Sequence, residues 1–461
     1  MSSNPLHAVT GVSEPYAGND SGMWKDGDRL NLLFISNFYP PLDSGGYPQL
    51  CWEIAQALRQ RGHRVAVISS SPQRQKAQLE EKVLSREPAA EPIYRMLHLE
   101  CDLNYYRPLD FFLNWKRRRD ENLAMLGKVM DEIRPDVTLI WSLWGLSKSI
   151  AALAEARMPS RTAYYLAGYW PTGEDLHSVY WRKPARHPIT RGLKRVGSYF
   201  ARQQLESNNH VKLKFANVMC VSAALRENLV GKGLPLENAR IVHNGIDLEQ
   251  FSQRRRPAHL CDQTRKLRLL YAGQLAYHKG VHTAVEAIDI LVNQLYIKDI
   301  YLTILGNGHP EYEAYLHRAV AESKLVGYIG FHDRIPRDQL PGFLSEFDAL
   351  VLPSIYEEPL ARIAQEAMAA GLVVVATSTG GTRELLREGE NGLVFTPGDP
   401  RELAHKIAIL SRDEETAERM RSAGRKTIVE HFNIDRAADE VEAYLVELAG
   451  QAGKEPQTGF F

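Results

Sequence analysis

The stretch from Leu30 to Ser69 reads LNLLFISNFYPPLDSGGYPQLCWEIAQALRQRGHRVAVIS and decides the class of fold. Residues 30–36 are a short apolar run, which is typical of a buried parallel strand. Residues 47–61 carry apolar side chains at helical spacing, and a second apolar run follows at 65–69. Strand, helix and strand in this order predict a parallel sheet with right-handed crossovers.

The same alternation fills the rest of the chain. Further strands are expected at 137–141, 162–166, 218–221 and 240–242, with helices at 120–133, 147–157 and 222–231. A second series of strands is expected at 267–272, 302–305, 328–331, 349–352, 373–376 and 393–395. Two doubly wound α/β units are therefore predicted, and ligands of such units bind beyond the carboxyl ends of the strands, here in the cleft between the units.

The predicted boundaries follow from changes in composition. Residues 1–28 are polar and are expected to be a flexible tail, 29–249 the first unit, and 250–265 a charged linker. Residues 266–432 form the second unit, and 433–461 a final helix followed by a tail. Asp26-Gly27-Asp28 matches a DxD metal motif, but it precedes the first strand and is interpreted as a chance match.

Composition excludes several classes of protein. Of the 461 residues 44% are hydrophobic and 24% charged, as in ordinary soluble proteins. Lys plus Arg and Asp plus Glu both number 56, which disfavours a polyanion-coating protein. The cysteines are scattered without a CxxC pair, which excludes a zinc ribbon or a disulfide framework: Cys51, Cys101, Cys220 and Cys261. No apolar run is long enough for a signal peptide or a membrane span, so a cytoplasmic protein is expected.

Two loops between a strand and a helix have the features of phosphate sites. Gly45 and Gly46 precede the first helix, where free amides favour an anion and glycine lets a bulky group approach. Gly273 and Gln274 open the loop GQLAYHKG, in which Lys279 would add positive charge at a helix start. A plain turn and a surface lysine would give the same patterns.

A pair of glutamates follows the strand at 349–352. Glu358 lies in the turn, and Glu366 lies eight residues later on the next helix. One carboxylate can accept two hydrogen bonds, which suits sugar and ribose hydroxyls. Two solvated glutamates are the alternative.

These three groups occur in order on the predicted sheet edges, and together they resemble the retaining glycosyltransferases of the GT-B fold, family 4. The resemblance extends over about residues 30–448 and includes Arg61–His63, Val221-Ser222, His243–Asp247 and Gly380-Gly381. It implies a hexosyltransferase that needs no metal or cofactor and takes a nucleotide sugar as donor and a hydroxyl acceptor. The first unit is expected to bind mainly the acceptor and the second mainly the donor.

The resemblance also implies roles for single residues. Glu358 and Lys279 are the expected catalytic residues, Glu358 near the donor sugar and Lys279 on the diphosphate. Glu366 is expected on the nucleotide ribose, and Gly45 and Gly46 face the phosphates. The remaining expected donor contacts are Gly273, Gln274, Pro359, Leu360 and Ala361.

Two departures from the family pattern affect these expectations. Many members have Arg where Gln274 stands, so this chain lacks one positive charge that would bind the phosphate. After the strand at 162–166 this chain has Ala167-Gly168, which offer a sugar no side-chain hydrogen bond. The acceptor-side candidates are therefore Tyr169, Trp170, Glu174, Asp175 and His177, although an ordinary polar loop is the preferred interpretation of the last three.

A basic stretch at 181–202 holds seven Arg or Lys residues and no acid, interleaved with apolar residues. Together with Trp115 and 116–119 it is a candidate for docking on an anionic membrane, where lipid-linked acceptors are found. A solvated helix is the alternative, and nucleic acid is not an expected partner.

Polysaccharide or lipid-linked glycan assembly is the favoured setting. Small-molecule or natural-product glycosylation and a non-catalytic nucleotide-sugar-binding protein remain alternatives.

Overall fold

The computed structural model of the protein describes residues 29–42, 45–71, 92–101, 106–185, 188–206, 211–251 and 266–451. The predicted tail 1–28 with Asp26-Gly27-Asp28, most of the predicted linker and the last ten residues, 452–461, lie outside the described residues.

The first unit is built on a seven-stranded parallel sheet of order β3-β2-β1-β4-β5-β6-β7. Its strands are β1 (Asn31–Ser36), β2 (Arg64–Ser70), β3 (Ile93–Leu97), β4 (Val137–Ser142), β5 (Thr162–Leu166), β6 (Asn217–Cys220) and β7 (Arg240–Ile241). Its helices are α1 (Gly46–Gln60), α3 (Pro108–Ile133), α4 (Ser149–Arg157), α5 (Leu176–Arg182), α6 (Arg191–Glu206) and α7 (Ala223–Gly231).

The second unit repeats the arrangement with six parallel strands of order β10-β9-β8-β11-β12-β13. Its strands are β8 (Leu267–Ala272), β9 (Ile300–Leu305), β10 (Ile329–His332), β11 (Ala349–Leu352), β12 (Val373–Thr377) and β13 (Leu393–Phe395). Its helices are α8 (Val281–Asp289, continued by a π-helical turn to Gln294), α9 (Pro310–Glu322), α10 (Leu340–Leu344), α11 (Arg362–Ala370), α12 (Thr382–Leu385), α13 (Pro400–Arg412) and α14 (Glu414–His431).

The predicted fold class is confirmed, because both sheets are parallel and doubly wound. Strand order reverses between β1 and β4 and again between β8 and β11, and such reversals open a crevice at the carboxyl ends of the strands. The strands themselves are apolar and buried, as their sequence predicts. Strand β3 was not predicted, because its sequence IYRML is only half-buried and carries a charge.

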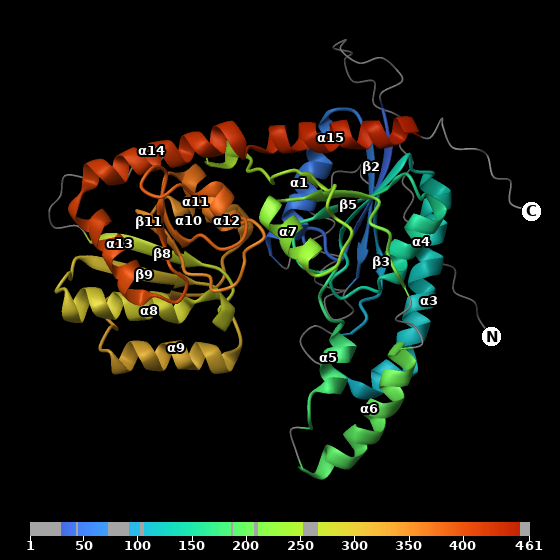
Figure 1. The fold of residues 1–461 in the computed structure, drawn as a ribbon, viewed down its shortest axis with the longest axis horizontal. Helices are drawn as coiled ribbons and strands as arrows, with labels where there is room; N and C mark the ends of the chain where they lie inside the picture. The colour runs from blue at the N-terminus through green and yellow to red at the C-terminus, as the bar shows by residue number, and fades with distance from the viewer. Residues whose placement is uncertain are drawn as a thin grey trace, which may run out of the picture.

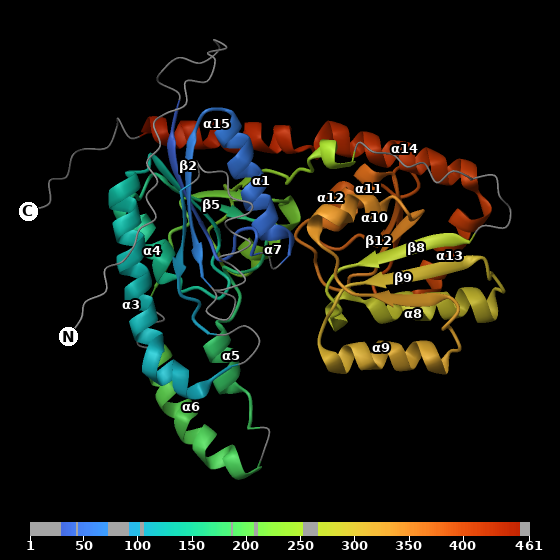
Figure 2. The ribbon, with the colours of Figure 1, turned by 180° about the vertical axis from the view of Figure 1, so that it is seen from behind.

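The last helix, α15 (Ile434–Gly450), continues the line of α14 and runs from the second unit back along the first (Figures 1 and 2). Glu442 of α15 binds Arg61 at 2.6 Å and His63 Nε2 at 2.7 Å. Because His63 Nδ1 accepts a hydrogen bond from the amide of Leu30, Nε2 carries the proton and donates a hydrogen bond to Glu442. The Arg61–His63 segment thus anchors the returning helix.

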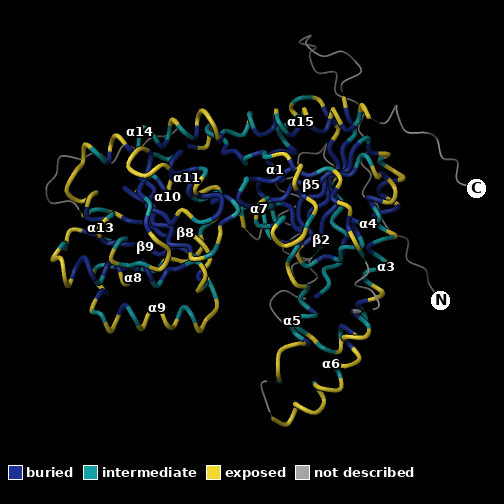
Figure 3. The backbone as a smooth tube through the Cα atoms, in the orientation of Figure 1, coloured by how far each residue is buried: buried dark blue, intermediate teal, exposed yellow. Residues whose placement is uncertain are grey.

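A helical lobe projects from the first unit, away from both sheets (Figure 1). We define it as the first half of α3 (108–119) together with α5 and α6. Five side chains form its own small hydrophobic core: Phe111, Trp115, Trp181, Ala201 and Leu205. The burial colouring shows α6 largely exposed, in contrast to the strands (Figure 3).

Candidate functional site

A cavity of about 440 Å³ lies between the two units, at the carboxyl ends of strands from both sheets. The first unit contributes Gly46, Tyr47, Leu50, Ala167, Gly168, Tyr169, Val221 and Asn244. The second contributes Tyr271, Ala272, Gly273, Lys279, Leu352, Tyr356, Glu358, Pro359, Leu360, Ala361, Arg362 and Ile363. This is the position at which doubly wound sheets bind ligands.

Lys279 and Glu358 are brought together in this cavity. The Lys279 ammonium lies 2.8 Å from Glu358 Oε1 and 3.0 Å from the hydroxyl of Tyr356. Glu358 Oε1 also accepts from Ser354 at 2.5 Å, and Oε2 accepts from Tyr356 at 2.7 Å. Burial, reinforced by the adjacent Glu358 carboxylate, raises the pKa of Tyr356, so its hydroxyl stays a donor at neutral pH. The carboxylate is therefore held by hydrogen-bond donors on both oxygens.

Glycine is required beside Lys279. Gly280 has φ +68°, and a Cβ there would lie 1.9 Å from the carbonyl oxygen of Pro353. The amide of Ile355 also binds the carbonyl of His278 at 2.9 Å. The lysine loop is thus pressed against the end of β11, and this contact places Lys279 over the turn that carries Glu358.

Glu366 lies in a buried ion network. Arg362 Nε donates to Glu366 Oε1 at 2.8 Å, and Arg337 contacts the same oxygen. Arg362 also reaches across the cleft to Glu53 of α1, at 2.7 Å. Burial alone would lower the pKa of Arg362, but the Glu53 and Glu366 carboxylates outweigh it and raise the pKa. Glu366 does not line the cavity, although Arg362 does.

The two loop glycines of the first unit have different positions. Gly46 lines the cavity and packs on Arg362, since a Cβ there would lie 3.1 Å from Arg362 Cδ. Gly45 has φ +110°, a conformation that favours glycine, and it is exposed outside the lining residues. Asp43 and Ser44 lie outside the described residues.

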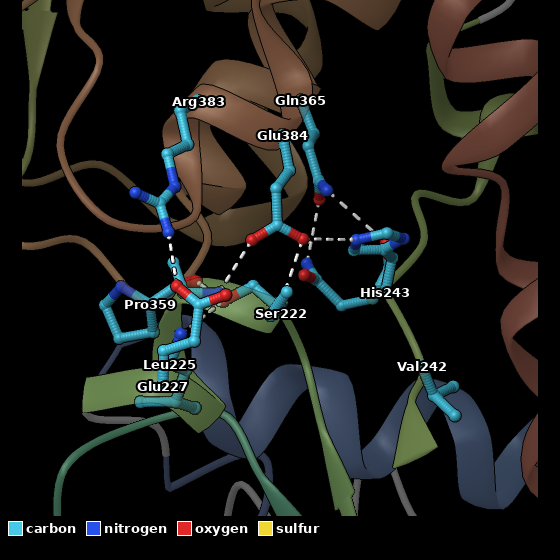
Figure 4. Close-up of polar contacts among 12 residues, drawn as sticks. Ser222, Leu225, Glu227, Val242, His243, Pro359, Gln365, Arg383 and Glu384 are labelled. Atoms are coloured by element: carbon cyan, nitrogen blue, oxygen red, sulfur yellow. Dashed lines mark hydrogen bonds and ion pairs between the residues drawn. The ribbon is translucent and has the colours of Figure 1, made fainter. Parts of the chain in front are cut away.

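Polar contacts join the two units (Figure 4). Ser222 donates to the carbonyl of Pro359 at 2.5 Å, and Glu384 accepts from the amides of Ala223 and Ala224 and from His243 at 2.9 Å. Burial alone would raise the pKa of Glu384, but these hydrogen bonds outweigh it and hold the pKa below its ordinary value. The Val221-Ser222 and His243 motifs thus form the interface between the units.

The acceptor-side candidates are dispersed. Tyr169 lines the cavity and donates to the carbonyl of Glu357 at 3.0 Å, whereas Trp170 is buried and donates to the carbonyl of Trp141. Glu174 pairs with Arg182, and Asp175 caps α5 by accepting from the amide of Ser178. His177 is packed in the aromatic core of the lobe, where burial lowers its pKa to about 4. The structure therefore brings only Tyr169 of this set to the cavity.

Among the expected donor contacts, Gly273, Pro359, Leu360 and Ala361 line the cavity, and Gln274 does not. Gln274 is exposed, and its carbonyl accepts from Tyr271 at 2.8 Å.

Four cavity or near-cavity residues were not predicted: Tyr47, Ser354, Tyr356 and Arg362. The hydroxyl of Tyr47 binds the carbonyls of Trp141 and Tyr165 and the amide of Ala167, which ties the helix start to two strand ends. Ser354 and Tyr356 stand within four residues of Glu358, and this spacing in the turn was the available signal. No such local signal points to Arg362, because its partner Glu53 is distant in the chain.

Within the described ranges, no group of His, Cys, Asp or Glu is arranged to hold a metal ion. In the same part of the chain, no helix is long and apolar enough to cross a membrane.

Two parallel Rossmann-type sheets that face each other across a cavity make up the architecture known as the GT-B fold. Residues 44–250 match the family described as Glycosyltransferase Family 4, and residues 254–427 match the family described as Glycosyl transferases group 1. The chain belongs to this family of enzymes.

Known proteins resemble the chain over more than nine tenths of its length. It is 25% identical to the glycogen synthase of Mycobacterium tuberculosis over 452 residues, which cover 93% of this chain and 97% of that protein. The sucrose-phosphate synthase structure from Thermosynechococcus elongatus aligns with a TM-score of 0.65 at 19% identity, over 92% of this chain and 100% of that one. HepE of Anabaena in complex with UDP-glucose aligns with a TM-score of 0.62 at 19% identity, over 91% of this chain and 100% of that one.

Proposed function

We propose that this glycosyltransferase moves a sugar from a nucleotide-diphosphate sugar to a hydroxyl acceptor, with retention at the anomeric carbon and without a metal ion. The observation that carries the proposal is the Lys279–Glu358 pair in a cavity lined by both units. The complex of Anabaena HepE with UDP-glucose supports a nucleotide-sugar donor, and the glycogen synthase relative supports a glycan acceptor.

The donor diphosphate belongs near Lys279 and the start of α11. Lys279 supplies a positive charge, and the amides around Leu360 and Ala361 precede the amino end of α11, where helix dipoles favour anions. As the bond between the anomeric carbon and the β-phosphate oxygen breaks, the diphosphate gains charge that these groups stabilise. The acceptor oxygen then bonds to the same carbon from the same face, and its proton passes to the departing phosphate oxygen.

Glu358 is assigned a binding role and not a nucleophilic one. Its oxygens accept hydrogen bonds from Lys279, Ser354 and Tyr356, and these bonds hold electron density that attack on carbon would require. Such a fixed carboxylate suits the hydroxyls of the donor sugar and the orientation of Lys279. The scheme of glycoside hydrolases, in which one carboxylate is the nucleophile and a second the acid, therefore does not apply to Glu358.

The acceptor is proposed to be a growing polysaccharide or a lipid-linked glycan, handled at the cytoplasmic face of a membrane. The first unit presents Tyr47, Ala167, Gly168 and Tyr169 to the cavity. These residues offer an aromatic wall and little hydrogen-bonding capacity, which fits recognition of a sugar ring by stacking more than by side-chain hydrogen bonds.

The test is a thermal-shift panel of uridine, guanosine, adenosine and thymidine diphosphates and their sugars, with and without chelator. A nucleotide at 100 times its dissociation constant should stabilise the enzyme by about 2.7 kcal/mol. One base should stabilise the enzyme with chelator present, and Glu358→Gln should reduce the shift for the sugar nucleotide more than for the bare diphosphate. Glu357→Gln is the matched control, because Glu357 is exposed beside the cavity without lining it.

Two outcomes would contradict the proposal. Failure of every nucleotide to stabilise the protein would remove the donor assignment. Donor binding without sugar release to any hydroxyl acceptor or to water would instead support the non-catalytic alternative.

A further inference from the structure

We propose that the helical lobe is a docking surface for an anionic lipid membrane. The lobe comprises 108–119 of α3 together with α5 and α6, and it projects away from both sheets (Figures 1 and 2). Neither the family assignment nor the cavity accounts for this projection, whose outer surface is apolar and basic.

Large apolar side chains are exposed on the lobe. On α6 they are Leu193 at 79%, Val196 and Tyr199 at 60% and Phe200 at 57%, with Ile189 at 94% just before the helix. On the first turns of α3 they are Leu109 at 76% and Leu113 at 75%. A soluble surface rarely gathers so many large apolar side chains on one projection without a partner.

These exposed apolar side chains do not belong to the hydrophobic core of the lobe. Leu193, Val196 and Phe200 follow a spacing of three and four and so share one face of α6. Gly197 and Ala201 lie on another face, where Gly197 packs so closely on Trp181 that a Cβ would come within 3.0 Å of its ring. The helix therefore has one apolar face that is used internally and a second one turned outward.

The unpaired charge that the lobe exposes has one sign. Lys183, Arg191, Arg195 and Arg202 are exposed and, among the described residues, make no ion pair. Among the described side chains, three acids in or beside the lobe are already paired: Asp110 with Arg118, Asp120 with Arg119 and Glu174 with Arg182. Exposed apolar side chains and unpaired cations on the same projecting lobe match a layer of anionic headgroups above acyl chains, which a protein partner of ordinary composition does not offer.

The lobe lies at the edge of the sheet that also forms the cavity. Helix α3 follows β3, and α5 follows the β5 loop whose Ala167–Tyr169 segment lines the cavity. Both connections leave the carboxyl ends of their strands. A membrane bound by the lobe would therefore face the side of the first unit on which the cavity opens.

The test is co-sedimentation of the full chain with vesicles of phosphatidylcholine, with and without phosphatidylglycerol. The wild type should bind only the anionic vesicles, and raising the salt to about 0.5 M should weaken binding because the charges are exposed. Arg191→Gln with Arg195→Gln should weaken binding about 25-fold, at about fivefold for each charge near the surface. Leu193→Ser with Phe200→Ser should weaken it at least about tenfold, since both lose inserted apolar groups.

Matched controls lie on the second unit. Val326→Ser removes an apolar side chain that is 72% exposed, and Arg412→Gln with Lys426→Gln removes two exposed charges. Both should bind vesicles like the wild type. Nucleoside-diphosphate binding should be unchanged in every lobe variant, which separates failure of this proposal from failure of the proposed function and shows that the variants fold.

Three results would overturn the proposal. The first is no preference of the wild type for anionic vesicles, and the second is undiminished binding by the Leu193→Ser, Phe200→Ser variant. The third is self-association of the wild type in light scattering that the same two substitutions abolish, because the face would then be an interface between copies of this chain.

Discussion

The Lys279–Glu358 pair can be dissected by removing its members singly and together. Glu358 is 6% exposed, so Lys279→Met leaves a buried carboxylate with only the Ser354 and Tyr356 hydroxyls as donors. Removing one partner of a buried pair typically costs about 3–5 kcal/mol. Because two donors remain and the lysine side chain is 19% exposed, we expect a loss of about 2–3 kcal/mol here.

The double variant Lys279→Met with Glu358→Gln leaves no unpaired charge and should cost only about 1 kcal/mol, since a neutral amide replaces the carboxylate. Donor affinity should not recover with stability. A hydrogen bond from a charged donor is worth about 1.5–3 kcal/mol, so both variants should bind the nucleoside diphosphate about 10- to 150-fold more weakly.

Urea unfolding gives the free energies of unfolding, and calorimetric titration gives the dissociation constants. The reasoning fails if the double variant is as unstable as Lys279→Met, because the loss would then not come from a stranded charge. The assignment of Lys279 to the diphosphate fails if either variant binds the nucleotide like the wild type.

Three further predictions address other parts of the molecule. Gly280→Ala should cost about 2–4 kcal/mol in urea unfolding, through its positive φ and the clash with Pro353, and a neutral effect would show that the loop is not pressed on β11. Burial, with Asp175 adding to it, raises the pKa of Glu100 from 4.5 to about 7. Its stabilising contribution is therefore complete below pH 4.5 and is lost as the pH rises through about 7, so Glu100→Gln should flatten this part of the stability profile, and an unchanged profile would refute the assignment. The pKa of Glu384 is depressed, so its contribution holds at neutral pH and is lost in acid; Glu384→Gln should cost about 2 kcal/mol at pH 7 and little at pH 3, and equal costs at both would contradict this.

Much of the fold could be predicted from the sequence because parallel strands buried on both faces leave continuous apolar runs. Ala349–Leu352 and Val373–Thr377 are examples, and the helices between such runs carry their own spacing. Strand β3 was not predicted because it is half-buried and carries Arg95, so it has neither a continuous apolar run nor helical spacing. Helix α3 begins at Pro108, twelve residues before the predicted start, because Phe111 and Trp115 of its first turns pack in the core of the lobe and not on the sheet.

The candidate site was predictable only where its residues are close in the chain. Lys279 and Glu358 stand on neighbouring strand ends, β8 and β11, so a correct sheet order brings them together. The Arg362–Glu53 contact depends on how the two units face each other, which no local pattern encodes. Glu174, Asp175 and His177 were plausible from their types, yet a salt bridge, a helix cap and an aromatic core use them locally.

The charges of the cleft suggest how it distinguishes its ligand. The cations among the residues that line the cavity are Lys279 and Arg362, and each already has carboxylate partners, Glu358 for the lysine and Glu53 with Glu366 for the arginine. A diphosphate therefore meets a site that is close to neutral and must share its cations with fixed carboxylates. Net charge alone would attract any polyanion, whereas cations held in place by partners favour the anion whose oxygens fit between them. The buried carboxylates thus supply geometry, because the cost of positioning the cations is met when the protein folds and not when the ligand binds.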